Sequence, residues 1–108
     1  MPDRESLFTA VTCIDKPGEE STTARQDLLA VHLEYVETIL EQILVAGPLY
    51  DDDGETLVGS LFIYRTGDVA GARALLENDP YFEAGFWAEI RFNPFLAAAG
   101  TAVGGKTW

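Results

Sequence analysis

The stretch "AGPLYDDDGETLVGSLFIYR", residues 46–65, contains two extended segments joined by a turn. The run AGPLY opens the first segment, and DDDG is a turn signal in which Gly54 can adopt a positive φ. The second segment, TLVGSLFIYR at 56–65, is rich in apolar residues and is typical of a strand. The stretch therefore predicts a β-hairpin in the middle of the chain.

The segments before the hairpin predict a strand and then a long helix. Residues 6–14, SLFTAVTCI, are rich in β-branched and aromatic residues and favour a strand. The polar run DKPGEEST, with its proline and glycine, is expected to be a loop. From about residue 23 to residue 45, apolar residues recur at spacings of three and four, which predicts an amphipathic helix that Gly47 and Pro48 end.

The segments after the hairpin predict a second helix and a last strand. Asp68 is a suitable N-cap for a helix over 69–78. The run DPYFEAG has the form of an N-cap at Asp79, a proline at the first helical position, a short turn and a glycine C-cap. FWAEIRFN at 86–93 alternates apolar and polar residues like a half-buried strand.

The resulting order, β-α-β-β-α-β, predicts an α+β protein with the ferredoxin-like fold, in which two helices lie on one face of an antiparallel four-stranded sheet. Apolar residues on both faces of strand 56–65 imply that the open face is also covered. We expect a second copy to cover it, giving a two-fold symmetric homodimer of the dimeric α+β-barrel type. We expect the fold to span residues 1–95, and the Gly/Ala-rich residues 96–108 to form an arm that either packs on the partner or is disordered.

Composition limits the partners and the compartment. A net charge of −11 with seven Lys and Arg argues against nucleic acid and against an anionic membrane surface. Cys13 is the single cysteine, so no internal disulfide forms, and one His beside one Cys is too few for a typical zinc site. The acidic run Asp51-Asp52-Asp53 lacks the spacing of a calcium loop and is expected to be a solvated turn. Because the N-terminus has no apolar leader, we expect a cytoplasmic protein. We also expect it to use no metal and no cofactor.

His32, the single histidine, lies four residues after Leu28 and four before Val36, so it belongs to the inward stripe of the first helix. A histidine there can be a core residue bonded to a backbone carbonyl, or a general base, because its imidazole titrates near neutrality. The residues alone leave these two interpretations open.

The motifs HL in the first helix, AGP, GS in the third strand region, DPY, AG and NPF occur in this order over roughly residues 6–95. In this pattern the chain resembles the YciI-like (YCII-related) family. The resemblance implies a dimeric ferredoxin-like protein with an active site on His32 and Asp79, and with Ser60, Gly47 and Pro48 nearby. It also implies substrate-binding roles for Tyr81 of DPY and for Arg25, which fills one of two arginine positions that are frequent in the family, while Leu29 occupies the other.

The resemblance extends to dehydrochlorinases, which implies a cofactor-independent lyase or isomerase that uses general acid/base catalysis on a small cyclic or aromatic molecule. In that hypothesis His32 is the base and Asp79 orients it. The alternative is a non-catalytic dimer that binds a small molecule or serves as an accessory domain. Each residue also has a purely structural interpretation: Asp79 as a helix cap, Ser60 as a small residue that allows close packing, and Arg25 as a surface residue with a packed stem.

Overall fold

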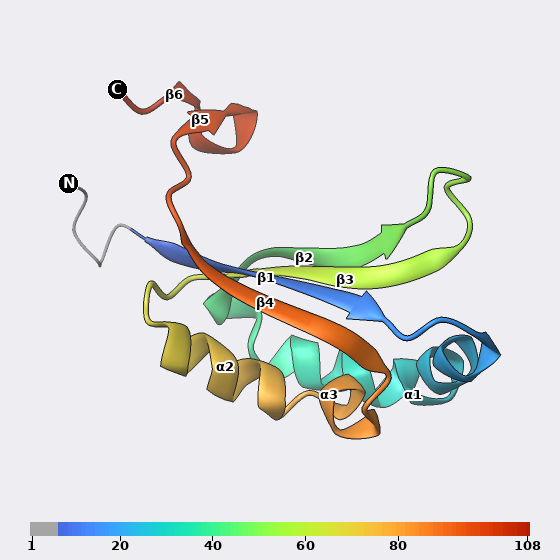
Figure 1. Ribbon diagram of the computed structural model, residues 1–108. Coiled ribbons are helices and arrows are strands. Elements are labelled where there is room, and N and C mark those ends of the chain that lie inside the picture. The colour runs from blue at the N-terminus through green and yellow to red at the C-terminus, as the bar shows by residue number, and fades with distance from the viewer. Residues whose placement is uncertain (1–6) are drawn as a thin grey trace.

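The computed structural model describes residues 7–108. Residues 1–6, with the start of the predicted domain 1–95 and the first residue of the predicted strand 6–14, lie outside the described residues. Along the chain the elements are β1 (Phe8–Asp15), α1 (Glu19–Thr38), a 3-10 turn (Leu40–Gln42), β2 (Ile43–Tyr50), β3 (Leu57–Tyr64), α2 (Val69–Glu77), α3 (Pro80–Ala84) and β4 (Trp87–Phe95) (Figure 1). A short two-stranded element, β5 (Ala99–Gly100) and β6 (Gly105–Lys106), follows with a 3-10 turn (Thr101–Val103) between its strands.

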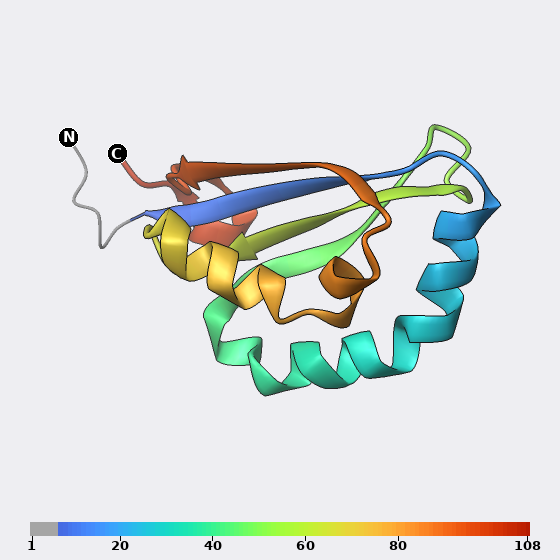
Figure 2. The ribbon, with the colours of Figure 1, turned by 60° about the horizontal axis from the view of Figure 1, so that its bottom comes forward.

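The four long strands form one antiparallel sheet in the order β2-β3-β1-β4. Helices α1, α2 and α3 lie on the same face of this sheet, and α3 packs beside α1 (Figures 1 and 2). The predicted α+β class and four-stranded antiparallel sheet are confirmed, and the strand order is compatible with the ferredoxin-like arrangement. Within residues 7–108 no helix is both long enough and apolar enough to cross a membrane.

The apolar spacing predicts the first helix too far along the chain. Instead of running from about 23 to 45, α1 begins at Glu19 and ends at Thr38, and residues 43–50 form β2. Gly47 and Pro48 therefore lie inside a strand, and their predicted role as a helix stop was wrong. Pro48 is tolerated there because β2 is an edge strand, so one of its sides needs no ladder hydrogen bonds.

A β-bulge in β4 changes which residues face the helices. Ile14 of β1 pairs with Glu89, but the next residue, Asp15, pairs with Trp87, so Ala88 is the extra residue. Trp87 is consequently buried under the helices, although strict alternation along 86–93 predicts that every second residue from Trp87, through Glu89 and Arg91, faces away from them. Beyond the bulge the predicted alternation is observed.

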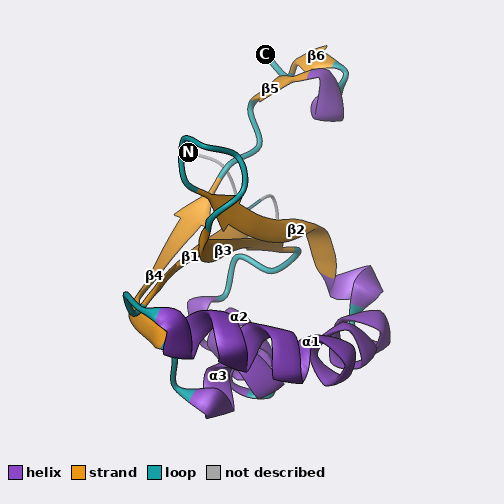
Figure 3. Ribbon diagram, turned by 90° about the vertical axis from the view of Figure 1, so that its right-hand side faces the viewer, coloured by secondary structure: helices purple, strands orange, loops and turns teal. Residues whose placement is uncertain are grey.

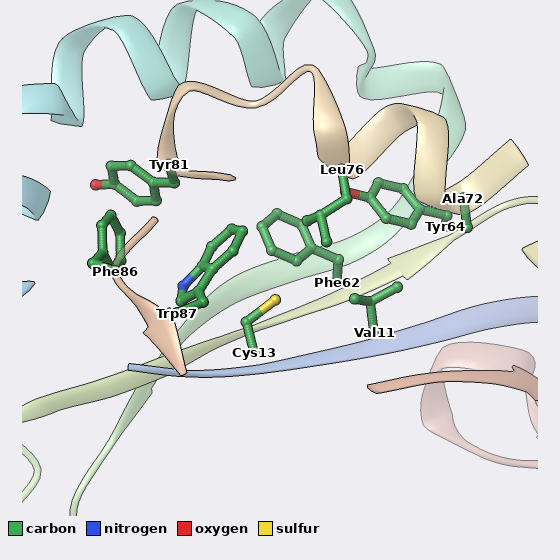
Figure 4. Packing of buried hydrophobic residues seen from close by; sticks show 9 residues of the cluster. All are labelled: Val11, Cys13, Phe62, Tyr64, Ala72, Leu76, Tyr81, Phe86 and Trp87. Carbon is green, nitrogen blue, oxygen red and sulfur yellow. The ribbon is translucent and has the colours of Figure 1, made fainter. Parts of the chain in front are cut away.

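The core lies between the sheet and the helices (Figure 4). It is rich in aromatic rings, which pack mostly edge to face, as between Tyr81 and Phe86 and between Phe86 and Trp87. Each large side chain buried in this way contributes roughly 1.5–3 kcal/mol to stability. The buried apolar residues are Val11, Cys13, Phe62, Tyr64, Ala72, Leu76, Tyr81, Phe86 and Trp87.

Within residues 7–108, no helix lies on the opposite face of the sheet. Val45 is 55% exposed there, and Leu61 and Ile63 of β3 are only partly buried. Figure 3 shows the element β5-β6 standing clear of the sheet on this open side. The last residue of this C-terminal segment, Trp108, is exposed.

Candidate active site

Helix α1 brings Arg25 and His32 to one face, because residues seven apart are separated by two helical turns. That face looks toward the sheet and toward α3. Arg25 is buried and His32 is partly buried, whereas Glu34 and Glu37 lie exposed on the outer side. Two side chains with ionisable or hydrogen-bonding groups are thus held under the helix layer.

His32 is hydrogen bonded to Asp79, with 2.8 Å between Nδ1 and Oδ1. Asp79 is also the N-cap of α3, since the same Oδ1 accepts a hydrogen bond from the Tyr81 N–H at 2.9 Å. The carboxylate is 1% exposed. Asp79 therefore serves as a helix cap and as a histidine partner together, which its acceptor positions permit.

Tyr81 lies against the other side of the histidine. Its ring is parallel to the imidazole, with centroids 3.9 Å apart, and its hydroxyl donates to the backbone oxygen of Arg25 at 3.1 Å. Burial raises the pKa of the Tyr81 phenol, and the nearby Arg25 opposes that shift. The neutral phenol thus holds the ring of His32 while also touching the cavity described next.

A cavity of about 390 Å³ lies between α1 and the β2-β3 hairpin. Its size is in the range of small-molecule sites. Most of its wall is apolar, and Leu29 is part of that wall. The sequence-predicted residues Arg25, His32, Gly47, Pro48, Ser60 and Tyr81 all line the cavity, together with Gln26, Leu29, Leu33, Val36, Ala46, Tyr50, Leu57 and Phe62.

The second ring nitrogen of His32, Nε2, is available at this cavity. It makes no hydrogen bond within residues 7–108. The His32 side chain is 13% exposed, so it is not sealed in the core. Since His32 lines the cavity, Nε2 can meet a bound molecule there.

Arg25 is held by an ion pair that the sequence analysis missed. Its Nε and Nη2 donate to the two carboxylate oxygens of Asp15 at 2.7 and 2.9 Å, and Nη2 also contacts Gly59 O and Ser60 Oγ at 2.8 and 3.0 Å. Asp15 ends β1, ten residues before Arg25, and no local pattern links the two. The one signal in the sequence was an acidic residue directly after the predicted strand 6–14.

The other residues considered from the sequence lie away from this cavity. Cys13 is in the core, where burial raises the pKa of its thiol to about 12. Asp53 holds the β2-β3 turn by accepting from the Thr56 hydroxyl and from the N–H groups of Thr56 and Glu55, and these hydrogen bonds lower the pKa of its carboxyl group. In the part of the chain that the structure describes, no three His, Cys, Asp or Glu side chains gather as metal ligands.

The fold and the site define a small α+β protein with an apolar cavity whose wall carries a histidine that is bonded to a buried carboxylate. The chain belongs to the family of the YCII-related domain, whose model matches residues 7–96. No curated protein matches it. A similar solved structure is the 5-chloro-2-hydroxyhydroquinone dehydrochlorinase of Burkholderia phenoliruptrix AC1100 in complex with 2,5-dihydroxybenzoquinone, at 26% identity and a TM-score of 0.70, over 87% of this chain and 96% of that one.

Proposed function

We propose that the protein is a cofactor-independent lyase or isomerase that moves a proton on a small cyclic or aromatic molecule. One observation carries the proposal: His32 is bonded to the buried Asp79 through Nδ1, and the same side chain lines an apolar cavity while its Nε2 has no hydrogen-bond partner within residues 7–108. A base in such a place can act on a ring compound that the apolar wall holds.

Asp79 sets the tautomer of the His32 imidazole. A carboxylate at Nδ1 favours the tautomer with hydrogen on Nδ1, which leaves the lone pair on Nε2. When Nε2 accepts a proton, the imidazolium forms beside Asp79 and is stabilised by its charge. The pair therefore acts as a base first and as an acid once it has been protonated.

Two outcomes follow for a ring substrate. In an elimination, Nε2 takes a proton, the electron pair left behind forms a new double bond, and chloride leaves with the electrons of its bond to carbon. In an isomerisation, the proton returns to another atom of the same ring. Both reactions balance without an oxidant or reductant. The dehydrochlorinase neighbour, with its dihydroxybenzoquinone complex, supports the first outcome.

The test is chloride release from 5-chloro-2-hydroxyhydroquinone by the wild type and by His32→Asn. We expect release by the wild type and a loss of about 10²–10⁴-fold in the variant, which is the usual contribution of a general base. Glu34→Gln, on the exposed side of the same helix, is the control and should retain full activity. Binding of 2,5-dihydroxybenzoquinone without turnover would favour the alternative, a non-catalytic binding protein.

We further propose that the protein acts as a homodimer in which the open faces of the two sheets meet. The half-exposed Val45 and the partly buried Leu61 and Ile63 form an apolar surface there that no helix of the described residues covers. An isologous contact of this kind uses the same residues on both copies. It leaves the cavity, which lies on the helix side of the sheet, within each protomer.

A further inference from the structure

Two hydrogen-bond donors remain unused next to the cavity. Ser60 Oγ accepts from Arg25 Nη2, but its own hydrogen has no acceptor within residues 7–108. Arg25 donates through Nε and Nη2, and its Nη1 has no acceptor in the described part of the chain. Arg25 is 5% exposed and lines the cavity, so its side chain keeps a small accessible surface there.

Both donors are held in place before any ligand arrives. The two hydrogen bonds that Arg25 donates to Asp15 fix the plane of the guanidinium, and the carbonyl of Gly59 fixes its Nη2 end. Ser60 is on β3, in the sheet, and Arg25 is on α1, so the donors come from the two walls of the cavity. Donors that need no rearrangement stabilise developing charge most effectively.

The charges around the cavity indicate which ligand these donors fit. Arg25 is already balanced by Asp15, and Asp79 adds a second buried carboxylate. A ligand that enters as a carboxylate would add another negative charge to this set. A neutral phenol or ring carbonyl adds none, and becomes negative only when His32 has taken its proton and turned positive.

We propose that Arg25 and Ser60 form an oxygen-binding subsite that receives the hydroxyl or carbonyl oxygen of a neutral ring compound. This inference rests on the proposed function and names the substrate class of the same cavity. The proton passes from the ligand to His32 Nε2, and the electron pair it leaves is delocalised onto the ligand oxygen. That oxygen then accepts from the Ser60 hydroxyl and from Arg25 Nη1.

The experiment compares phenol, toluene and benzoate, three rings of similar size, by NMR titration of the wild type. We expect phenol to bind about fivefold more tightly than toluene, because phenol makes one additional hydrogen bond. We expect phenol also to bind about fivefold more tightly than benzoate, because benzoate adds a negative charge beside Asp15 and Asp79. Equal affinity for phenol and toluene would overturn the subsite. Tighter binding of benzoate than of phenol would overturn the neutral substrate class.

Ser60→Ala removes one donor with little change in volume. We expect it to reduce phenol affinity about fivefold and to leave toluene affinity unchanged. Ser21→Ala is the matched control, because it deletes another buried hydroxyl, one that donates to Lys16 O away from the cavity. An unchanged phenol affinity in Ser60→Ala would contradict the role of Ser60.

The same variants separate this inference from the proposed function. If phenol binding depends on Ser60 while His32→Asn releases chloride as fast as the wild type, the subsite stands and the catalytic base is refuted. If chloride release depends on His32 while Ser60→Ala changes neither affinity nor rate, the base stands and the subsite is refuted. The two proposals can therefore fail independently.

Discussion

The imidazole of His32 and the phenol ring of Tyr81 are stacked with 1° between their planes and 3.9 Å between their centroids. Tyr81 also donates its backbone N–H to the carboxylate of Asp79, and that carboxylate is bonded to His32. Three consecutive residues of the DPY motif thus place both the hydrogen-bond partner of His32 and the surface against its ring. A motif that looks like a helix cap in the sequence orients the candidate base.

Asp79→Asn should separate catalysis from capping. The amide oxygen can still accept from the Tyr81 N–H, so we expect a stability change of only about 1 kcal/mol. The same amide oxygen also faces His32 and can accept from its Nδ1–H, so the tautomer is kept, but the neutral amide no longer stabilises the imidazolium as the carboxylate does. We expect chloride release to fall by about tenfold or more, since a charged hydrogen-bond partner is replaced by a neutral one. Urea unfolding of the same sample measures the stability. A variant of normal stability and normal rate would contradict the role of Asp79.

Tyr81→Phe and Tyr81→Leu should differ in their effect on the site. Phenylalanine keeps the stack on His32 and loses the hydrogen bond to Arg25 O, which costs about 1 kcal/mol of unfolding free energy. Leucine loses the stack as well, so the imidazole can rotate away from the cavity. We expect near-normal turnover in the first variant and a clear loss in the second, beyond any change in folded fraction. Equal turnover in both would show that the stack does not position His32.

Gly59→Ala should strongly destabilise the fold. A methyl group at Gly59 would run into the backbone oxygen of Cys13, which belongs to the neighbouring strand β1 and cannot yield like a flexible side chain. We expect a loss of at least about 2 kcal/mol, by analogy with other overpacked sites. Gly47→Ala in β2 is the control, because its methyl group meets no atom within 4 Å. Urea unfolding of both variants measures the difference, and equal stabilities would refute the close approach.

The thiol of Cys13 should make the fold less stable as the pH rises above about 8.5. Burial, with the charges of Asp79 and Asp15 adding to it, raises the pKa of this thiol to about 12 in the folded state, against about 8.5 unfolded. Between these values the unfolded chain releases the proton that the folded chain keeps, so its contribution to stability declines as pH increases. Urea unfolding from pH 8 to 9.5 measures the slope, and Cys13→Ala should reduce it. An identical slope in the variant would assign the effect to other groups.

The sequence predicts those elements whose pattern is local, and it fails where the cause is distant in the chain. The hairpin, α2 and the cap at Asp79 follow from turn and capping residues within a few positions of each other. The end of α1 does not, because residues 43–45 are as apolar as a helix stripe requires, and only their pairing with β3 makes them a strand.

The site shows the same division. The resemblance names His32 and Asp79 as a pair, although they lie 47 residues apart and only the fold brings them within 2.8 Å. The ion pair of Arg25 with Asp15 and the bulge that turns Trp87 inward depend on the register between β1 and its neighbours. That register pairs strands far apart in the chain, so no short stretch of the sequence can reveal it.

Light scattering tests the homodimer. We expect the wild type at twice the 11.8 kDa mass of one chain. Ile63→Glu places a charge in the middle of the open face, so that two carboxylates would meet near the two-fold axis and at least partly dissociate the pair. Val31→Glu, on α1, is the control, since it places the same charge at an exposed apolar residue of the helix layer and should leave the mass unchanged. A wild type that scatters as 11.8 kDa would contradict the homodimer. A dimer that dissociates in Val31→Glu and persists in Ile63→Glu would show that the contact lies elsewhere.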